Sequence, residues 1–143
     1  MFENIKNNVQ NKFYPVDMDE CNDVEVQLGI RFPNMFKEFY KEVGYGFLSS
    51  QVDNINRVMD PKSILDFRLR QNDYEFYPDI EIYEEFEDDK LIFFEGNESS
   101  MISIGIGEEN EGIVYYYDVE ISKNLKEFLD KISQNDSFYY DSF

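Results

Sequence analysis

Residues 91–118 read LIFFEGNESSMISIGIGEENEGIVYYYD and contain three β-prone runs in close succession. The runs Leu91–Phe94, Met101–Ile106 and Ile113–Asp118 are rich in β-branched and aromatic residues, which are typical of strands. Between the runs lie two glycine-containing segments, Gly96–Ser100 and Gly107–Gly112, which are short enough to be hairpin turns. We therefore predict an antiparallel meander in the second half of the chain.

A helix is expected after this meander, because apolar residues return there at helical spacing. We expect it to begin at Ser122 and to carry the apolar face Leu125, Phe128, Leu129 and Ile132. Residues 134–143 form a short tail with the aromatic residues Phe138, Tyr139, Tyr140 and Phe143. This composition is compatible with a frayed tail and with one that folds back against the sheet.

Three helices are expected in the N-terminal third, where apolar residues recur every three or four positions. The first is a helix of about 12 residues that ends before Pro15, with the apolar face Phe2, Ile5, Val9 and Phe13. The third is closed by Gly44 and Gly46 and has the apolar face Phe36, Phe39, Tyr40 and Val43.

The second expected helix starts at Asp17, which forms a capping box with Glu20 three residues later. It ends at Gly29, a residue type that readily adopts the left-handed conformation of a helix terminus. Cys21 shares the apolar face of this helix with Val24 and Leu28. We therefore expect Cys21 to be a small core residue and not a nucleophile.

The middle of the chain gives weaker signals. Phe47–Leu48 and Ile55–Met59 are candidate short strands, and Asp60–Pro61 marks the start of a helix. Residues 71–90 are acidic and aromatic, and we expect a loop there with a short helix or strand. Because helices come first and strands later, without βαβ alternation, we predict an α+β fold in which N-terminal helices pack on an antiparallel or mixed sheet, followed by a C-terminal helix. The expected domain covers residues 1–133.

The composition excludes several kinds of function. The 143 residues include one cysteine and no histidine, which argues against an intramolecular disulfide, a multi-cysteine metal site and histidine-dependent catalysis. No run of 18 apolar residues is present, and the polar N-terminus does not resemble a secretion signal. We therefore expect a cytoplasmic protein.

Negative charge is concentrated in one part of the chain. The formal net charge is −18, and residues 71–122 contain 16 acidic residues against the single base Lys90. The other 91 residues carry 15 acidic and 12 basic residues. Such a field repels nucleic acids and anionic membranes and attracts basic proteins.

Several motifs resemble the SUKH superfamily, which includes the Smi–Knr-type proteins. The matching segments, in the order found in the family, are LGIRFP at 28–33, FKEFY at 36–40, GYGFL at 44–48, DKLIFF at 89–94, IVYYYD at 113–118 and LKEFL at 125–129. The resemblance spans residues 18–132, although the late strands carry tyrosine where many members carry tryptophan. It implies function by binding, since many bacterial members are immunity proteins that neutralise a toxin, often a nuclease, and fungal relatives are regulatory interaction proteins.

Two acidic segments are the candidate partner-binding site. The larger comprises Asp79, Glu81, Tyr83, Glu84, Glu85, Phe86, Glu87, Asp88 and Asp89, and the smaller comprises Glu108, Glu109 and Glu111. The carboxylates would pair with lysine and arginine of a basic partner, while Tyr77, Tyr83 and Phe86 act as aromatic anchors. The opposing interpretation is that these aromatic residues pack beneath the loop as a small core, and that the acids are a solvated face.

We therefore predict a non-enzymatic immunity protein that binds and occludes a cognate basic toxin, with a nuclease as the expected class. It needs no cofactor and binds no metal, nucleic acid or membrane. One alternative is a regulatory protein-interaction module. Another is a metal-dependent hydrolase that uses the acidic cluster, since Pro78-Asp79 followed by Asp88-Asp89-Lys90 matches a short nuclease motif by sequence alone.

Overall fold

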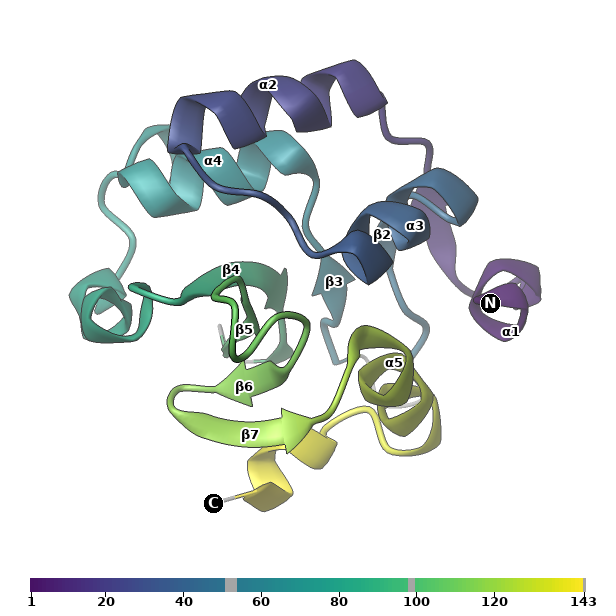
Figure 1. Ribbon diagram of the computed structural model, residues 1–143. Coiled ribbons are helices and arrows are strands. Elements are labelled where there is room, and N and C mark those ends of the chain that lie inside the picture. The colour runs from purple at the N-terminus through teal and green to yellow at the C-terminus, as the bar shows by residue number, and fades with distance from the viewer. Residues whose placement is uncertain (51–53, 98–99, 143) are drawn as a thin grey trace.

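The computed structural model describes residues 1–50, 54–97 and 100–142, which form a seven-stranded sheet with helices on both faces (Figure 1). All neighbouring strands are antiparallel, and they follow one another in chain order across the sheet. The strands are β1 (Lys12–Tyr14), β2 (Tyr45–Phe47), β3 (Arg57–Val58), β4 (Lys90–Glu95), β5 (Met101–Gly105), β6 (Val114–Tyr116) and β7 (Val119–Ser122). The predicted antiparallel meander is confirmed. Its predicted turn at 96–100 includes residues 98 and 99, which lie outside the described residues.

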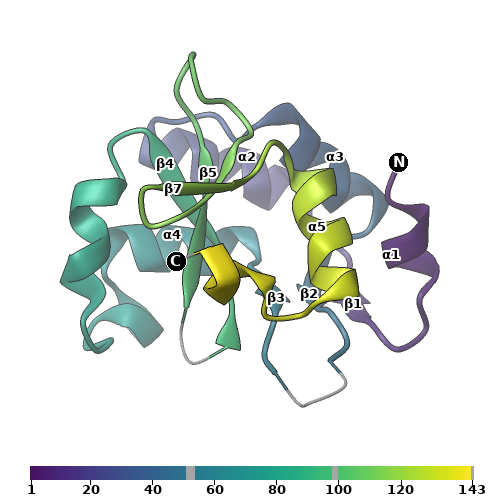
Figure 2. The same cartoon turned by 90° about the horizontal axis from the view of Figure 1, so that it is seen from below.

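The helices form two layers. The α-helices are α1 (Glu3–Asn7), α2 (Met18–Leu28), α3 (Asn34–Glu42), α4 (Pro61–Leu69) and α5 (Leu125–Gln134), and the 3₁₀ helices are η1 (Asn72–Tyr74), η2 (Ile80–Phe86) and η4 (Phe138–Ser142). Helices α2, α3 and α4 cover one face of the sheet, and α5 with the C-terminal segment covers the opposite face (Figures 1 and 2). The predicted α+β class is confirmed.

The two central strands are buried on both faces. Every residue of β5 is buried, and so are the four inner residues of β4. The Phe93 ring lies 5.3 Å from the Phe36 ring of α3, and the Phe94 ring lies 4.9 Å from the Phe128 ring of α5. A strand covered on both sides has no need for polar alternation, which explains the continuous apolar run at 91–94.

The prediction of a single first helix over residues 2–13 is wrong. Helix α1 ends at Asn7, and Val9 is 95% exposed. Asn8 and Asn11 interrupt the helix with side-chain bonds to the backbone: Asn8 accepts from the Gln10 amide, and Asn11 donates to the Ile5 carbonyl and accepts from the Ser49 amide. Such local bonds compete with helical ones, so the chain turns and continues as β1.

Strand β1 approaches β2 closely, and this approach requires the glycines that follow α3. Gly44 and Gly46 have φ values of 113° and 142°. A Cβ atom at Gly44 would lie 2.0 Å from the Tyr14 carbonyl oxygen, and one at Gly46 would lie 2.1 Å from that of Lys12. The two glycines therefore have two roles: they follow the end of α3, and their lack of a Cβ atom leaves room for β1.

The second helix is confirmed, with the predicted cap residues at both ends, although no bond from Glu20 completes the predicted capping box among the described residues. The Asp17 side chain accepts a hydrogen bond from the Asp19 amide, and Gly29 has a left-handed φ of 66°. Cys21 is fully buried on the inner face, and burial raises the pKa of its thiol to about 11. Cys21 is a core residue, as predicted.

The end of the sheet contains a strand that the sequence analysis missed. The run Ile113–Asp118 is not one strand, because β6 ends at Tyr116 and the chain turns at Tyr117, whose φ is 56°. Strand β7 follows and includes Ser122, so the predicted helix start at Ser122 is wrong. Helix α5 begins instead after Asn124, whose side chain accepts from the Glu127 amide.

The C-terminal tail folds back against the sheet. The Tyr139 ring is fully buried, and its hydroxyl donates to Asn56 Oδ1 at 2.9 Å and accepts from the Asn97 amide at 2.8 Å. Asp136 bonds to Ser50, and its carbonyl accepts from the Asn56 side chain at 2.7 Å. The tail is therefore part of the packed structure as far as Tyr140, while a domain boundary at residue 133 remains a prediction.

The buried tyrosine hydroxyl predicts a loss of stability in alkali. Burial raises the pKa of Tyr139 from 10 to about 12, so between these pH values the unfolded chain releases a proton that the folded chain retains. Tyr139 alone should therefore lower the free energy of unfolding by about 1.4 kcal/mol for each pH unit in this interval, and the other buried tyrosines, such as Tyr40 and Tyr83, add to the slope. Urea unfolding at a series of alkaline pH values measures the slope. The Tyr139→Phe variant should show a shallower slope, and an unchanged slope would contradict the assignment.

Candidate partner-binding site

The acidic segment between α4 and β4 folds over a row of apolar side chains. Two short 3₁₀ helices, η1 and η2, are connected by turns over residues 70–87. The inward-facing residues occur at every third position, which is the period of a 3₁₀ helix: Tyr74, Tyr77, Ile80, Tyr83 and Phe86. The Phe67 ring of α4 contacts the rings of Tyr74, Tyr77 and Tyr83 at centroid distances of 5.1, 6.2 and 5.9 Å. An aromatic cluster around Phe67 thus holds the segment against α4.

This packing separates the predicted site residues into two groups. The exposed carboxylates are those of Asp79, Glu81, Glu84, Glu85, Asp88, Asp89, Glu108, Glu109 and Glu111. Tyr83 is only 4% exposed, and Tyr77 and Phe86 are half-buried. Tyr83 therefore supports the segment from below and is not accessible as an anchor.

Glu87 is held inside an ion-pair cluster with α4. Arg70 Nη2 lies 2.6 Å from Glu87 Oε1, and Arg68 Nη1 lies 3.8 Å from Oε2. Burial raises the pKa of Glu87, and the two arginines oppose this shift. Because its carboxylate is engaged within the protein, we leave Glu87 out of the proposed contact surface.

Arg68 fixes the end of the acidic segment to α4. Its Nη2 donates to the Glu87 carbonyl at 2.8 Å, and its Nη1 donates to the Lys90 carbonyl at 2.7 Å. The guanidinium therefore satisfies two backbone acceptors on either side of Asp88 and Asp89. This bridge fixes where the acidic segment meets β4.

Removal of this bridge should loosen the acidic segment. We expect Arg68→Ala to lower the free energy of unfolding by about 2–4 kcal/mol, because two part-buried carbonyls lose their donor and Glu87 keeps only one of its two arginines. Hydrogen exchange should rise over residues 80–90, which mass spectrometry of peptides can measure. Arg31→Ala is the control, since Arg31 is exposed and should change neither quantity. Unchanged exchange at 80–90 would contradict the bridging role.

The smaller acidic turn is joined to the larger segment. Asn110 Nδ2 donates to the carbonyl and to Oδ2 of Asp89 at 3.1 and 3.2 Å, while its Oδ1 accepts from the Gly107 amide at 2.8 Å. The Ile106 amide also donates to the Asp89 carbonyl at 2.9 Å. Residues about twenty positions apart in sequence thereby form one continuous acidic surface.

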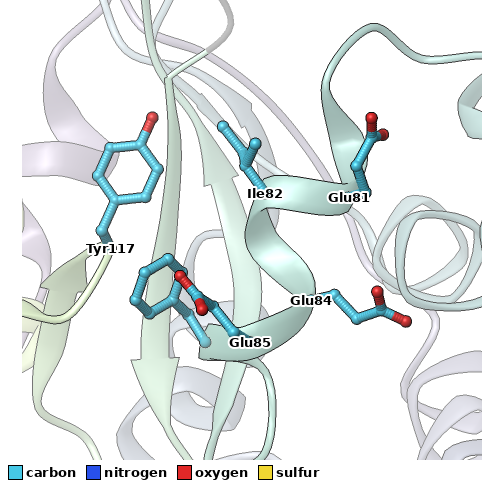
Figure 3. Close-up of a pocket in the computed structure, with 6 residues that line it drawn as sticks. Glu81, Ile82, Glu84, Glu85 and Tyr117 are labelled. Carbon is cyan, nitrogen blue, oxygen red and sulfur yellow. The ribbon is translucent and has the colours of Figure 1, made fainter.

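Two hollows lie in this surface. The first has a volume of about 600 Å³ and is lined by Glu81, Ile82, Glu84, Glu85, Phe86 and Tyr117 (Figure 3). The second has a volume of about 650 Å³ and is lined by Gly29, Ile30, Arg31, Asp88, Asp89, Ile106, Gly107, Glu108 and Glu111. Between them, the hollows include most of the exposed carboxylates predicted from the sequence, whereas Asp79 and Glu109 line neither.

Two exposed apolar residues were missed as contact candidates. Phe76 is 89% exposed, and Ile82 is 44% exposed. Both lie outside the every-third-residue series of inward positions, so the same period that identifies Tyr77 and Tyr83 as inward identifies these two as outward. They are better placed than Tyr83 to contact a partner.

Two further features of the described residues bear on function. Among them, no group of three or more acidic or cysteine side chains is arranged to hold a metal ion, so the hydrolase alternative gains no support there. Nor does any helix in the described part of the chain have the length and apolar character needed to cross a membrane.

Comparison with known proteins gives two matches that cover most of the chain. The family model SUKH_6, described as SMI1-KNR4 cell-wall, matches residues 18–140. The protein named immunity protein YxxD, from Bacillus subtilis (strain 168), is 54% identical over 137 residues, which cover 96% of this chain and 93% of that protein. The family match includes the acidic segment, the acidic turn and most of the C-terminal tail.

Proposed function

Because the chain belongs to the SMI1-KNR4 (SUKH) family, we propose that it is an immunity protein that binds a cognate toxin and blocks it. The observation that carries this proposal is the 54% identity, over nearly the full length of both chains, to a protein named as an immunity protein. The identical positions, 54% of 137 residues, outnumber the buried residues, so the identity extends beyond the core. The proposal therefore depends on more than the shared fold.

We further propose that the toxin is basic and that a nuclease is the first class to test. Nucleases hold their substrate in a positively charged cleft, and the exposed carboxylates around η2 and the β5–β6 turn would complement such a cleft. Occupation of the cleft would exclude the nucleic acid both sterically and by charge. The protein would act in the cytoplasm, where the substrate of such a toxin is found.

Co-expression with a candidate toxin, sought among the genes beside the gene of this chain, tests the proposal. A host that dies when it expresses the toxin domain alone should survive when it also expresses this chain. The purified proteins should form a stable complex, and the toxin should lose its catalytic activity in that complex. Death of the host despite co-expression, together with no complex by calorimetry, would contradict an immunity role toward that toxin.

The same experiment distinguishes the other two functions. Capture of a non-toxic protein from the source cell, without protection against the toxin, would favour a regulatory interaction module. Metal-dependent turnover of a nucleotide by the purified chain would favour a hydrolase. Protection by a chain without any turnover would support the proposed binding mechanism.

A further inference from the structure

We infer that the hollow between η2 and Tyr117 takes an arginine side chain of the partner protein, an inference that rests on the proposed function. Apolar and aromatic side chains line the hollow from two sides. Ile82 and Tyr117 face each other from η2 and the β6–β7 turn (Figure 3). The Phe86 ring lies 5.7 Å from the Tyr117 ring, with an angle of 60° between the two planes.

Carboxylates supply all the charge that lines this hollow among the described residues. Glu85 extends from η2 toward Tyr117, whereas Glu81 and Glu84 point away from Tyr117 (Figure 3). These three carboxylates are exposed, and none of them forms an ion pair with a described residue. An apolar floor with negative charge above it is complementary to a side chain with an apolar stem and a cationic head.

The protein itself binds two of its own cations in the same way. The Arg70 guanidinium carbon lies 5.1 Å from the centre of the Phe67 ring, and Nη2 lies 2.6 Å from Glu87 Oε1. The Lys90 ammonium lies 4.7 Å from the centre of the Tyr115 ring and 2.8 Å from Asp89 Oδ1. Each cation therefore combines one aromatic ring with one carboxylate. The hollow offers both of these components and no described cation among its lining residues.

The aromatic rings and carboxylates that line the hollow favour arginine over lysine. A guanidinium group is flat, stacks on aromatic faces and donates two parallel hydrogen bonds to one carboxylate. Tyr117 is held in place, because its ring stacks with those of Tyr83 and Tyr116 at 5.5 and 4.8 Å, with interplanar angles of 8° and 17°. A pre-positioned ring lowers the entropic cost of binding.

Titration of the isotope-labelled full chain with Nα-acetyl-arginine methylamide, followed by NMR, tests the inference. We expect saturable shifts at Ile82, Phe86 and Tyr117. The uncharged citrulline analogue should give no saturation. The lysine analogue should bind at least about threefold more weakly than the arginine analogue. Equal binding of citrulline would overturn the inference, and equal or tighter binding of lysine would overturn the assignment to arginine.

Variants of the hollow add a second criterion. Glu85→Gln should weaken arginine binding at least about threefold, and Glu84→Gln should weaken it less, because Glu84 points away from Tyr117. Glu38→Gln on α3 is the matched control and should leave binding unchanged. An equal effect of all three variants would show a general charge effect and would overturn the assignment to this hollow.

The toxin experiment separates the two proposals. If the chain protects the host and Glu85→Gln weakens the complex as it weakens arginine binding, both proposals are supported. If the chain protects the host but Glu85→Gln and Ile82→Ser leave the affinity unchanged, the inference about the hollow fails while the immunity role stands. If the chain gives no protection, the immunity role fails, and the arginine titration still reports whether the hollow binds a guanidinium group.

Discussion

Reversal of the four exposed carboxylates Glu81, Glu84, Glu85 and Asp88 to lysine should slow association with a basic toxin by about a hundredfold at low salt. Opposite charges steer two proteins together before contact, and rates change steeply when the sign of a patch is reversed. Asp89 is left intact because its carboxylate accepts from Asn110 and pairs with Lys90. Stopped-flow measurement of the association rate at several salt concentrations tests this expectation. The difference from the wild type should shrink as salt increases.

The matched control carries four reversals at exposed acids on α2, α3 and β7, namely Glu20, Asp23, Glu38 and Glu120. Both variants change the net charge by the same amount, so any difference between them reports the location of the charge. We expect the control to slow association far less. Equal slowing in both variants would place the effect in the net charge and would remove the surface around η2 from the proposed site.

Deletion of residues 135–143 should cost more than about 5 kcal/mol and should leave most of the chain unfolded. Tyr139 is fully buried, and the loss of a buried aromatic side chain costs about 3–5 kcal/mol by itself. The deletion also removes the partners of Asn56 and of the Asn97 amide. This sum is comparable with the total stability of a typical domain. Circular dichroism and urea unfolding measure the result.

Two single variants keep this prediction testable if the truncated chain does not accumulate. Tyr139→Ala should lower the free energy of unfolding by about 3–5 kcal/mol. Phe76→Ala removes an aromatic ring that is 89% exposed, so it should change stability by less than about 0.5 kcal/mol. Similar effects of the two variants would contradict the structural role of the tail.

The sequence predicted the elements whose ends carry local signals. Helix α2 has an acidic cap and a terminal glycine, α4 starts with Asp60-Pro61, and β4 is a continuous apolar run. These features act through neighbouring residues, so they can be recognised without knowledge of the tertiary structure. The family resemblance was likewise based on such residues, and the match over 18–140 confirms it.

The turn between β6 and β7 could not be predicted for a physical reason. Tyr117 adopts a left-handed conformation that tyrosine rarely takes, and the turn has no glycine or asparagine to mark it. The conformation is accompanied by ring contacts to Tyr83, Phe86 and Tyr116. Tertiary packing overrides the local preference there, so the run Ile113–Asp118 gives a three-residue strand and a turn, and the second strand starts only at Val119.

The error at the N-terminus had a different origin. Spacing alone placed Phe2, Ile5, Val9 and Phe13 on one helical face, but Phe13 reaches the core from β1, where its ring lies 5.8 Å from that of Phe39. Asn8 and Asn11, which lie between these residues, were the sequence signal against a continuous helix.

In the acidic segment, neither the helical period nor the strand period applies. Its period of three separates the inward-facing Tyr77 and Tyr83 from the outward-facing Phe76 and Ile82.

The bridge from Arg68 to the carbonyls of Glu87 and Lys90 has an evolutionary consequence. The chain leaves α4 and returns to β4 at nearly the same point, so the segment between them is a closed loop on a fixed base. The entropic cost of closing such a loop grows only slowly with its length. Insertions, deletions and substitutions in the outward positions can therefore accumulate without displacing the sheet. If the proposed toxin contact lies on this loop, one scaffold can acquire new specificities by exchange of the loop alone.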